Sequence, residues 1–152
     1  MSLDDDIRNV ARIPLFGDLE PEAQRLIAFG SETRILRAGD ILFRRGEKSD
    51  CGYIIQSGSI FFQVEEGGVP RDRVFGPNTL IGETALFTET ERPVTAVARE
   101  PCTILQVPRA LFGRVLREYP ASALTLRRKL SGRLDELLGA LERATKGDLG
   151  SG

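Results

Sequence analysis

The sequence predicts a mainly β domain of the sandwich, jelly-roll or barrel type, with helices on both sides of the β region. Residues 33–107 contain short runs rich in β-branched and aromatic residues, separated by turns. No helical stretch lies between successive runs, which argues against an alternating α/β sheet. The flanking residues 3–30 and 108–145 have helical spacing instead. The turns of the β region are marked by Gly39, Gly46, Gly52 and Gly58.

Two short helices are expected before the first strand. The acids at residues 4–6 precede Ile7, Val10 and Ala11, and acidic residues favour a helix N-terminus. A second helix is expected from Pro21, because the fixed φ of proline suits the first helical position, to about Gly30. The strands are then expected at residues 33–36, 41–43, 53–56, 59–64, 73–75, 94–98 and 103–107.

Helical patterns return after the last strand. Residues 109–116 predict a short helix that ends near Pro120. A longer helix should follow, because leucines recur every three or four residues, as expected for one helix face, at Leu126, Leu130, Leu134, Leu137 and Leu141. We expect one domain over residues 1–146 and a disordered tail over residues 147–152.

Composition excludes several kinds of chemistry. The 152 residues carry a net charge of −1, which argues against a broad nucleic-acid surface, and contain no histidine. Most zinc sites and most serine or cysteine hydrolases depend on histidine, so we expect neither a metal site, a cofactor nor an enzyme. The two cysteines, Cys51 and Cys102, are interpreted as buried free thiols, which favours a cytoplasmic location. No apolar run approaches 18 residues, and the acidic N-terminus is unlike a signal peptide.

Residues 75–97 carry the candidate site. Gly82 permits an unusual backbone conformation, and residues 83–86 can form one helical turn whose free N–H groups attract an anion. Arg92 offers a planar fork that binds phosphate, and Thr95 adds a hydroxyl at the start of a strand. From spacing alone, the alternative is an exposed loop in which Glu83 and Arg92 form a weak surface ion pair.

The same segment resembles the phosphate-binding cassette of cyclic nucleotide-binding domains. Upstream residues 38–43, 46–47 and 53–58 are similar to the first strands and glycine turns of that family. The resemblance spans residues 10–138 and implies a jelly-roll-like β-roll (a double-stranded β-helix) with flanking helices. The positions that match the cassette are Gly82, Glu83, Ala85, Leu86, Arg92, Thr95 and Ala96.

The resemblance implies a cyclic purine nucleotide, cAMP or cGMP, as the ligand. Glu83 would accept a hydrogen bond from the ribose 2′-hydroxyl, Gly82 would let its backbone approach the sugar, and Arg92 would pair with the cyclic phosphate. The N–H groups of Ala85 and Leu86 would donate to the phosphate oxygens. The complete predicted ligand-binding set is Gly82, Glu83, Thr84, Ala85, Leu86, Arg92, Pro93, Val94 and Thr95.

Two positions depart from the family pattern. Pro93 has no N–H group and so removes one expected donor to the phosphate, which weakens binding by roughly 1 kcal/mol. Thr84 stands where the family often has a bulkier apolar residue. These departures leave a second interpretation open, in which the chain keeps the fold as a protein–protein interaction scaffold without binding nucleotide.

The long C-terminal helix has three candidate roles. Leu134, Leu137 and Leu138 could form an apolar lid over the base, pack against the domain's own core, or form the seam of a homodimer. Residues 109–133 hold seven basic residues and one acid, which is either a solvated helix face or a surface for an acidic effector or a negatively charged membrane. No helix-turn-helix follows the long helix in this sequence, so we expect no DNA binding by this chain alone.

Overall fold

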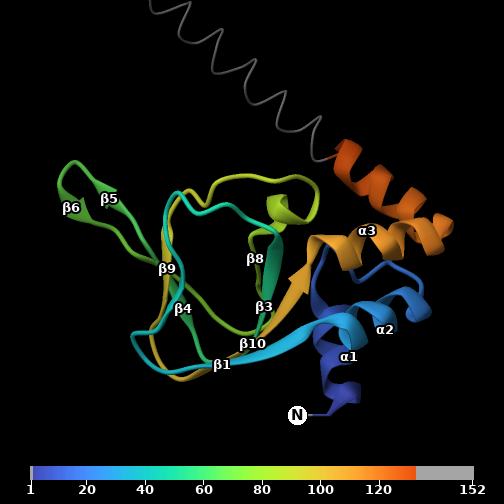
Figure 1. Cartoon of the computed structure of the whole chain (residues 1–152), viewed down its shortest axis with the longest axis horizontal. Coiled ribbons are helices and arrows are strands. Elements are labelled where there is room, and N and C mark those ends of the chain that lie inside the picture. Colours follow the sequence, from blue (N-terminus) through green and yellow to red (C-terminus); the bar gives the residue numbers. More distant parts are fainter. Residues whose placement is uncertain (1, 133–152) are drawn as a thin grey trace, which may run out of the picture.

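A computed structural model describes residues 2–132 of the chain, and these form two antiparallel sheets with helices packed against one of them (Figure 1). The first helix, α1, spans Leu3–Arg12 and begins with a capping box between Ser2 and Asp5. The second helix, α2, spans Pro21–Gly30 with proline in its first turn. Both helices therefore lie where their sequence signals predicted them.

The strands form two four-stranded sheets in which neighbouring strands are not consecutive in the sequence. One sheet has the spatial order β1–β10–β3–β8 and the other has the order β2–β9–β4–β7, and all these pairs are antiparallel. A small separate hairpin, β5–β6, projects from the roll (Figure 1). The strands are β1 Glu32–Leu36, β2 Ile41–Phe43, β3 Cys51–Ser57, β4 Ile60–Gln63, β5 Glu65–Glu66, β6 Val69–Pro70, β7 Arg73–Phe75, β8 Leu80–Ile81, β9 Thr95–Ala98 and β10 Cys102–Pro108.

This arrangement confirms the mainly β, jelly-roll-like roll flanked by helices. Two elements of it were not predicted: the β5–β6 hairpin and the two-residue strand β8. Helix α3 spans Arg109–Glu118 directly after β10, and a further helix covers residues 120–132. The predicted tail and the predicted lid residues Leu134, Leu137 and Leu138 lie outside the described residues.

Strand β3 separates two hydrophobic cores. Its side chains alternate between the two faces of the sheet, as in any strand. Ile54 packs toward the helices with Phe16 and Phe112, while Tyr53 and Ile55 face the interior of the roll between the two sheets. The strand is therefore buried on both faces, and its interior face forms part of the candidate site.

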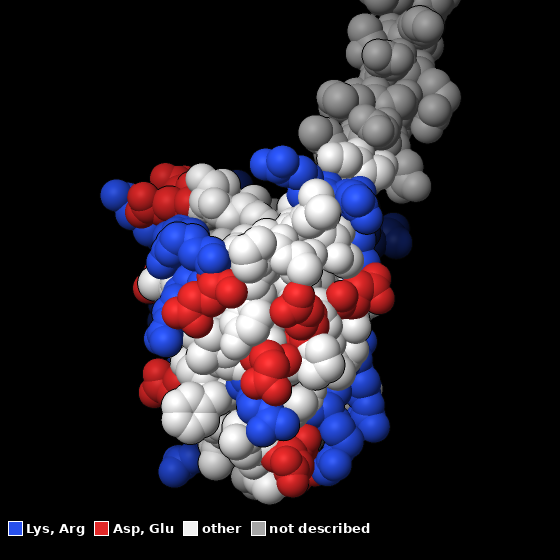
Figure 2. All heavy atoms as spheres, turned by 90° about the vertical axis from the view of Figure 1, so that its right-hand side faces the viewer, with Lys and Arg blue, Asp and Glu red and all other residues white. Residues whose placement is uncertain are grey.

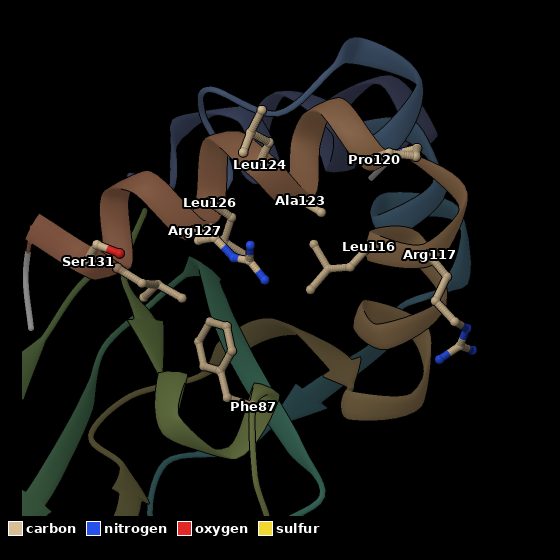
Figure 3. A pocket seen from close by; sticks show the side chains of 10 residues that line it. Phe87, Leu116, Arg117, Pro120, Ala123, Leu124, Leu126, Arg127 and Ser131 are labelled. Atoms are coloured by element: carbon tan, nitrogen blue, oxygen red, sulfur yellow. The ribbon is translucent and has the colours of Figure 1, made fainter.

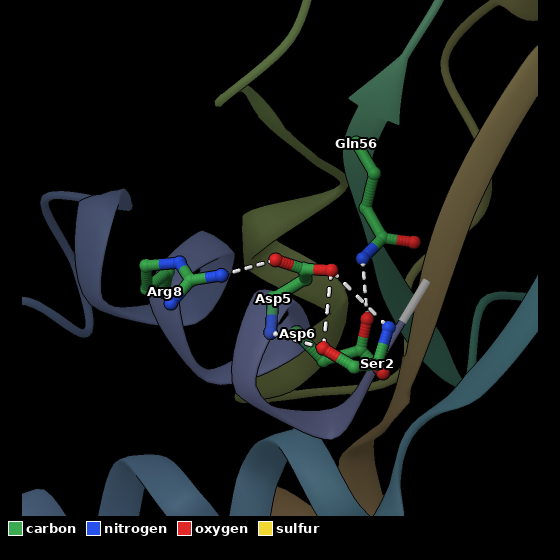
Figure 4. Close-up of polar contacts among 5 residues, drawn as sticks. All are labelled: Ser2, Asp5, Asp6, Arg8 and Gln56. Atoms are coloured by element: carbon green, nitrogen blue, oxygen red, sulfur yellow. Dashed lines mark hydrogen bonds and ion pairs between the residues drawn. The ribbon is translucent and has the colours of Figure 1, made fainter.

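Helix α1 is joined to β3 by a side-chain hydrogen bond. The Gln56 Nε2 group donates to Asp6 Oδ1 at 2.6 Å (Figure 4). Gln56 is only 9% exposed, and its Oε1 atom has no hydrogen-bond partner among the residues that the structure describes. This contact links the N-terminal helix to the central strand.

Candidate functional site

The site begins where β8 ends. Gly82 adopts φ 78° and ψ 35°, a left-handed conformation that glycine reaches without steric cost, and a 3-10 helix, η1, follows over Glu83–Leu86. Tyr53 of β3 faces Ile81 of β8, so the position opposite Cys51 would be residue 83, which starts η1 instead of continuing the ladder. The turn at Gly82 thus leaves the Cys51 carbonyl at the end of the ladder.

Arg92 takes the place of that missing strand partner. Its Nη2 atom donates to the Cys51 carbonyl at 2.8 Å and lies 3.6 Å from the Cys51 Sγ atom. A methyl group on Gly82 would lie 2.5 Å from Arg92 Nη1, so the guanidinium occupies the space that the glycine leaves open. The guanidinium of Arg92 therefore lies against the backbone of Gly82.

The guanidinium also lies over two aromatic rings. Its Cζ atom is 4.5 Å from the centre of the Phe43 ring and 5.4 Å from the centre of the Tyr53 ring. These are cation–π distances, which are most favourable where water is excluded. Arg92 is only 5% exposed, so its side chain points into the roll rather than into solvent. The alternative of an exposed surface arginine is therefore wrong.

The backbone of Arg92 is held by the segment between β2 and β3. The Arg92 N–H donates to the Glu47 carbonyl at 2.7 Å, and the Gly46 N–H donates to the Arg92 carbonyl at 2.8 Å. Just before it, the Thr90 N–H donates to the Ser49 hydroxyl at 3.1 Å. In Figure 1 the loop that contains Thr90 and Arg92 runs from η1 across the roll to β9. These bonds fix the point from which the Arg92 side chain enters the roll.

The other predicted site residues surround this arrangement. Ala85 and Leu86 are buried, and the Ala85 N–H donates to the Gly82 carbonyl at 3.0 Å. Thr84 and Pro93 are exposed, and Val94 packs against the interior of the roll. The remaining predicted residues are Glu83, which is half-buried in η1, and Thr95, which opens β9.

Thr95 lies beside an open, polar hollow. Its hydroxyl oxygen accepts a hydrogen bond from the Arg45 N–H at 3.0 Å. The hollow has a volume of about 760 Å³ and lies between the β5–β6 hairpin and the start of β9. Its polar lining residues are Arg45, Gln63, Glu65, Asp72 and Thr95. This side of the roll has room for a small polar ligand.

A second hollow, of about 720 Å³, lies between Phe87 and the C-terminal helices (Figure 3). The Phe87 side chain, directly after η1, points into it toward Leu116 of α3. The Phe87 ring also meets the Phe112 ring edge-on at 5.5 Å. Of the predicted leucine stripe, Leu126 is buried in the helical core and Leu130 packs against it, so these two leucines serve the core of the domain itself.

The basic residues of the C-terminal region are divided among different environments. Arg114 pairs with Glu118, Lys129 pairs with Asp18, and Arg109 donates twice to the Ser49 carbonyl, at 3.1 and 3.0 Å. On the helical side of the molecule, acidic and basic side chains are interspersed with uncharged surface (Figure 2). This mixture favours the interpretation as a solvated helix face.

Three contributors to the site were absent from the sequence prediction. They are the Phe43 ring, the Tyr53 ring and the Cys51 carbonyl. The alternation of β3 places Cys51 and Tyr53 on the interior face, so the pattern could have shown that they line the roll. Burial raises the pKa of the Cys51 thiol and of the Tyr53 phenol, so both groups stay neutral beside Arg92.

Comparison with known proteins identifies the family of the chain. The family model of the cyclic nucleotide-binding domain matches residues 33–119, more than half of the chain. The chain belongs to the cyclic nucleotide-binding domain family. Its matched segment contains η1, Arg92, helix α3 and both sheets except for the first residue of β1.

Three similar proteins illustrate the family. The cyclic AMP receptor protein of Thermus thermophilus is 33% identical over 125 residues, which are 81% of this chain and 58% of that protein. The cAMP-dependent protein kinase regulatory subunit of Eremothecium gossypii is 30% identical over 102 residues, which are 67% of this chain and 22% of that protein. The structure of a cyclic nucleotide-binding-like protein from Brucella abortus is 41% identical, with a TM-score of 0.67, covering 75% of this chain and 99% of that one. The chain therefore spans about a fifth to three fifths of the two curated relatives.

No helix in residues 2–132 combines the length and the apolar character needed to cross a membrane.

Proposed function

We propose that this chain binds a cyclic purine nucleotide as a non-catalytic regulatory module. The observation that carries the proposal is the placement of Arg92, which the loop after η1 brings into the roll against Gly82. The names of both curated relatives refer to cAMP, which favours cAMP over cGMP as the first ligand to test. The free thiols of Cys51 and Cys102 agree with a cytoplasmic location, which remains a prediction.

In this proposal each cassette residue contacts a different part of the nucleotide. Arg92 pairs with the cyclic phosphate, because a guanidinium can donate two parallel hydrogen bonds to phosphate oxygens. Glu83 accepts from the ribose 2′-hydroxyl, and the N–H groups at the start of η1 face the phosphate. The Ala85 N–H donates to the Gly82 carbonyl, so this hydrogen bond must be shared or released when the phosphate binds.

The proposed signal passes from η1 to the C-terminal helices. Leu86 of η1 packs in the same hydrophobic core as Phe112 of α3 and Leu126 of the following helix. A ligand that displaces η1 therefore also changes the packing of these helices, and it shifts their equilibrium by its difference in affinity for the two arrangements. The lid role of Leu134, Leu137 and Leu138, a homodimer through that helix and an effector protein stay predictions.

The experiment is isothermal titration calorimetry with cAMP and with cGMP. We expect wild-type protein to bind at least one of them, and Arg92→Ala to bind at least about 10-fold more weakly, since a hydrogen bond to a charged group contributes about 1.5–3 kcal/mol. Arg99→Ala is the matched control, because Arg99 is exposed just after β9. No heat from either nucleotide at millimolar concentration would contradict the proposal.

The scaffold interpretation is the second candidate, and two observations favour it. Arg92 is 5% exposed and already holds the Cys51 carbonyl, and Pro93 supplies no N–H to a phosphate. The same titration distinguishes the two candidates. A scaffold gives no heat with nucleotide, and self-association would then appear as a higher mass in light scattering.

A further inference from the structure

Several groups in the interior of the roll contact the Arg92 guanidinium. A carbonyl oxygen 2.8 Å from Nη2 supplies the acceptor, and the Phe43 and Tyr53 rings supply two aromatic faces. The open face of Gly82 supplies the space against Nη1. A guanidinium is weakly hydrated and stacks well on rings, so it is the side chain best suited to such a site.

This internal site hides the atoms that a phosphate would need. A bidentate phosphate contact requires two N–H groups of the guanidinium to be accessible together. Only 5% of Arg92 is exposed, so little of the guanidinium surface is open to a ligand while these contacts hold. We therefore expect a full bidentate contact with phosphate to require the guanidinium to leave its contacts with the Cys51 carbonyl and the two rings.

We propose that Phe43, Tyr53 and the Cys51 carbonyl hold Arg92 in competition with the nucleotide phosphate and thereby set the affinity of the site. The proposal rests on the proposed function, because the competing ligand is the cyclic nucleotide. If only a fraction of molecules has Arg92 free, the apparent dissociation constant rises in proportion to the reciprocal of that fraction. Phe43 and Tyr53 are thus positioning residues whose contacts with Arg92 weaken binding.

The proposal predicts that losing an aromatic face strengthens nucleotide binding. Phe43→Leu keeps an apolar side chain of similar size in the roll but removes the ring beneath the guanidinium. We expect this variant to bind cAMP up to about 30-fold more tightly, the gain corresponding to one desolvated cation–π contact of about 2 kcal/mol. A purely structural role for Phe43 predicts the opposite, since a loosened core would weaken binding.

Phe75→Leu is the matched control. Phe75 packs against Phe62 in the same interior cluster, with ring centres 4.6 Å apart, but its ring is not one of the two beneath Arg92. Both variants lose the same atoms from the same core. Calorimetry with cAMP on the wild type and both variants compares their affinities directly.

A spectroscopic measurement tests the internal site separately from ligand binding. In nitrogen-15 NMR, the Arg92 Nε–H proton, assigned by its loss in Arg92→Lys, should be shifted upfield by the rings and protected from exchange. Phe43→Leu should remove the upfield shift, and Phe75→Leu should leave it in place. An ordinary shift with fast exchange in the wild type would overturn the proposal whatever the calorimetry shows.

The outcomes separate this proposal from the proposed function. If the wild type binds cAMP but Phe43→Leu binds no more tightly than Phe75→Leu, competition is refuted and nucleotide binding stands. If neither the wild type nor Phe43→Leu gives heat while the NMR signature is present, nucleotide binding and competition are both refuted. Tighter binding by Phe43→Leu together with loss of the upfield shift supports both.

Discussion

Replacing Gly82 by alanine tests the contact on which the site is built. Gly82 has φ 78°, and the added methyl group would lie 2.5 Å from Arg92 Nη1. The substitution therefore imposes backbone strain and also pushes the guanidinium out of its internal site. Gly39→Ala is a matched control, because Gly39 has φ 89° and nothing lies within 4 Å of the position of its added methyl group.

The expected magnitudes follow from these two effects. Left-handed backbone at a non-glycine residue costs about 1–2 kcal/mol, and both variants pay this cost. Gly82→Ala also loses the charged hydrogen bond from Arg92 to the Cys51 carbonyl, which contributes about 1.5–3 kcal/mol. We therefore expect Gly39→Ala to lower the free energy of unfolding by about 1–2 kcal/mol and Gly82→Ala by about 2.5–5 kcal/mol.

The assay is equilibrium unfolding in urea, with the slope compared among variants to confirm that only stability has changed. The same two substitutions are repeated in an Arg92→Leu background, where the shorter side chain no longer overlaps the methyl group added at position 82. There the excess cost of Gly82→Ala should disappear. Equal losses for Gly82→Ala and Gly39→Ala in the wild-type background would refute the contact.

Two further predictions concern stability. Asp6→Ala should lower the free energy of unfolding by about 1–3 kcal/mol, because it removes the hydrogen-bond acceptor of the buried Gln56 amide. Asp4→Ala is the control and should lower it much less, because Asp4 is exposed in the same helical turn. Equal losses for the two variants in urea unfolding would contradict this prediction. Above the ordinary thiol pKa of about 8.5, the unfolded chain releases the Cys51 proton before the folded chain does, so stability should fall as pH rises. Cys51→Ala should show a shallower fall in the same alkaline series, and an unchanged slope would count against the raised pKa.

The sequence predicted the secondary structure correctly where a periodic apolar pattern corresponds to a buried face. The glycine turns and β-branched runs located the main strands, since each strand buries a face and must alternate. The β5–β6 hairpin was not predicted, because Glu65 and Glu66 are charged and exposed and so produce no apolar pattern. Strand β8 was missed because two residues, Leu80 and Ile81, are too few to form a pattern.

The pose of Arg92 lay beyond any pattern in the sequence. The spacing from Gly82 to Arg92 placed both residues in one loop, but it gave no direction for the side chain. That direction depends on the carbonyl that β3 leaves at Cys51 when the chain turns away at Gly82, and on rings contributed by two different sheets. Such contacts arise from tertiary packing of segments that are 41 residues apart in the sequence.

The most direct test of the central claim is a titration of nitrogen-15-labelled protein with cAMP, followed by two-dimensional NMR. If nucleotide binds at the cassette, the amide signals of Gly82, of residues 83–86 and of Arg92 and Thr95 should shift with a common dissociation constant. The signals of Gly39 and Asp40, which lie at the opposite end of β9 beside Ala98, should move less. If the spectrum is unchanged at saturating cAMP, or if the shifts lie only outside residues 82–95, the cassette is not a nucleotide site.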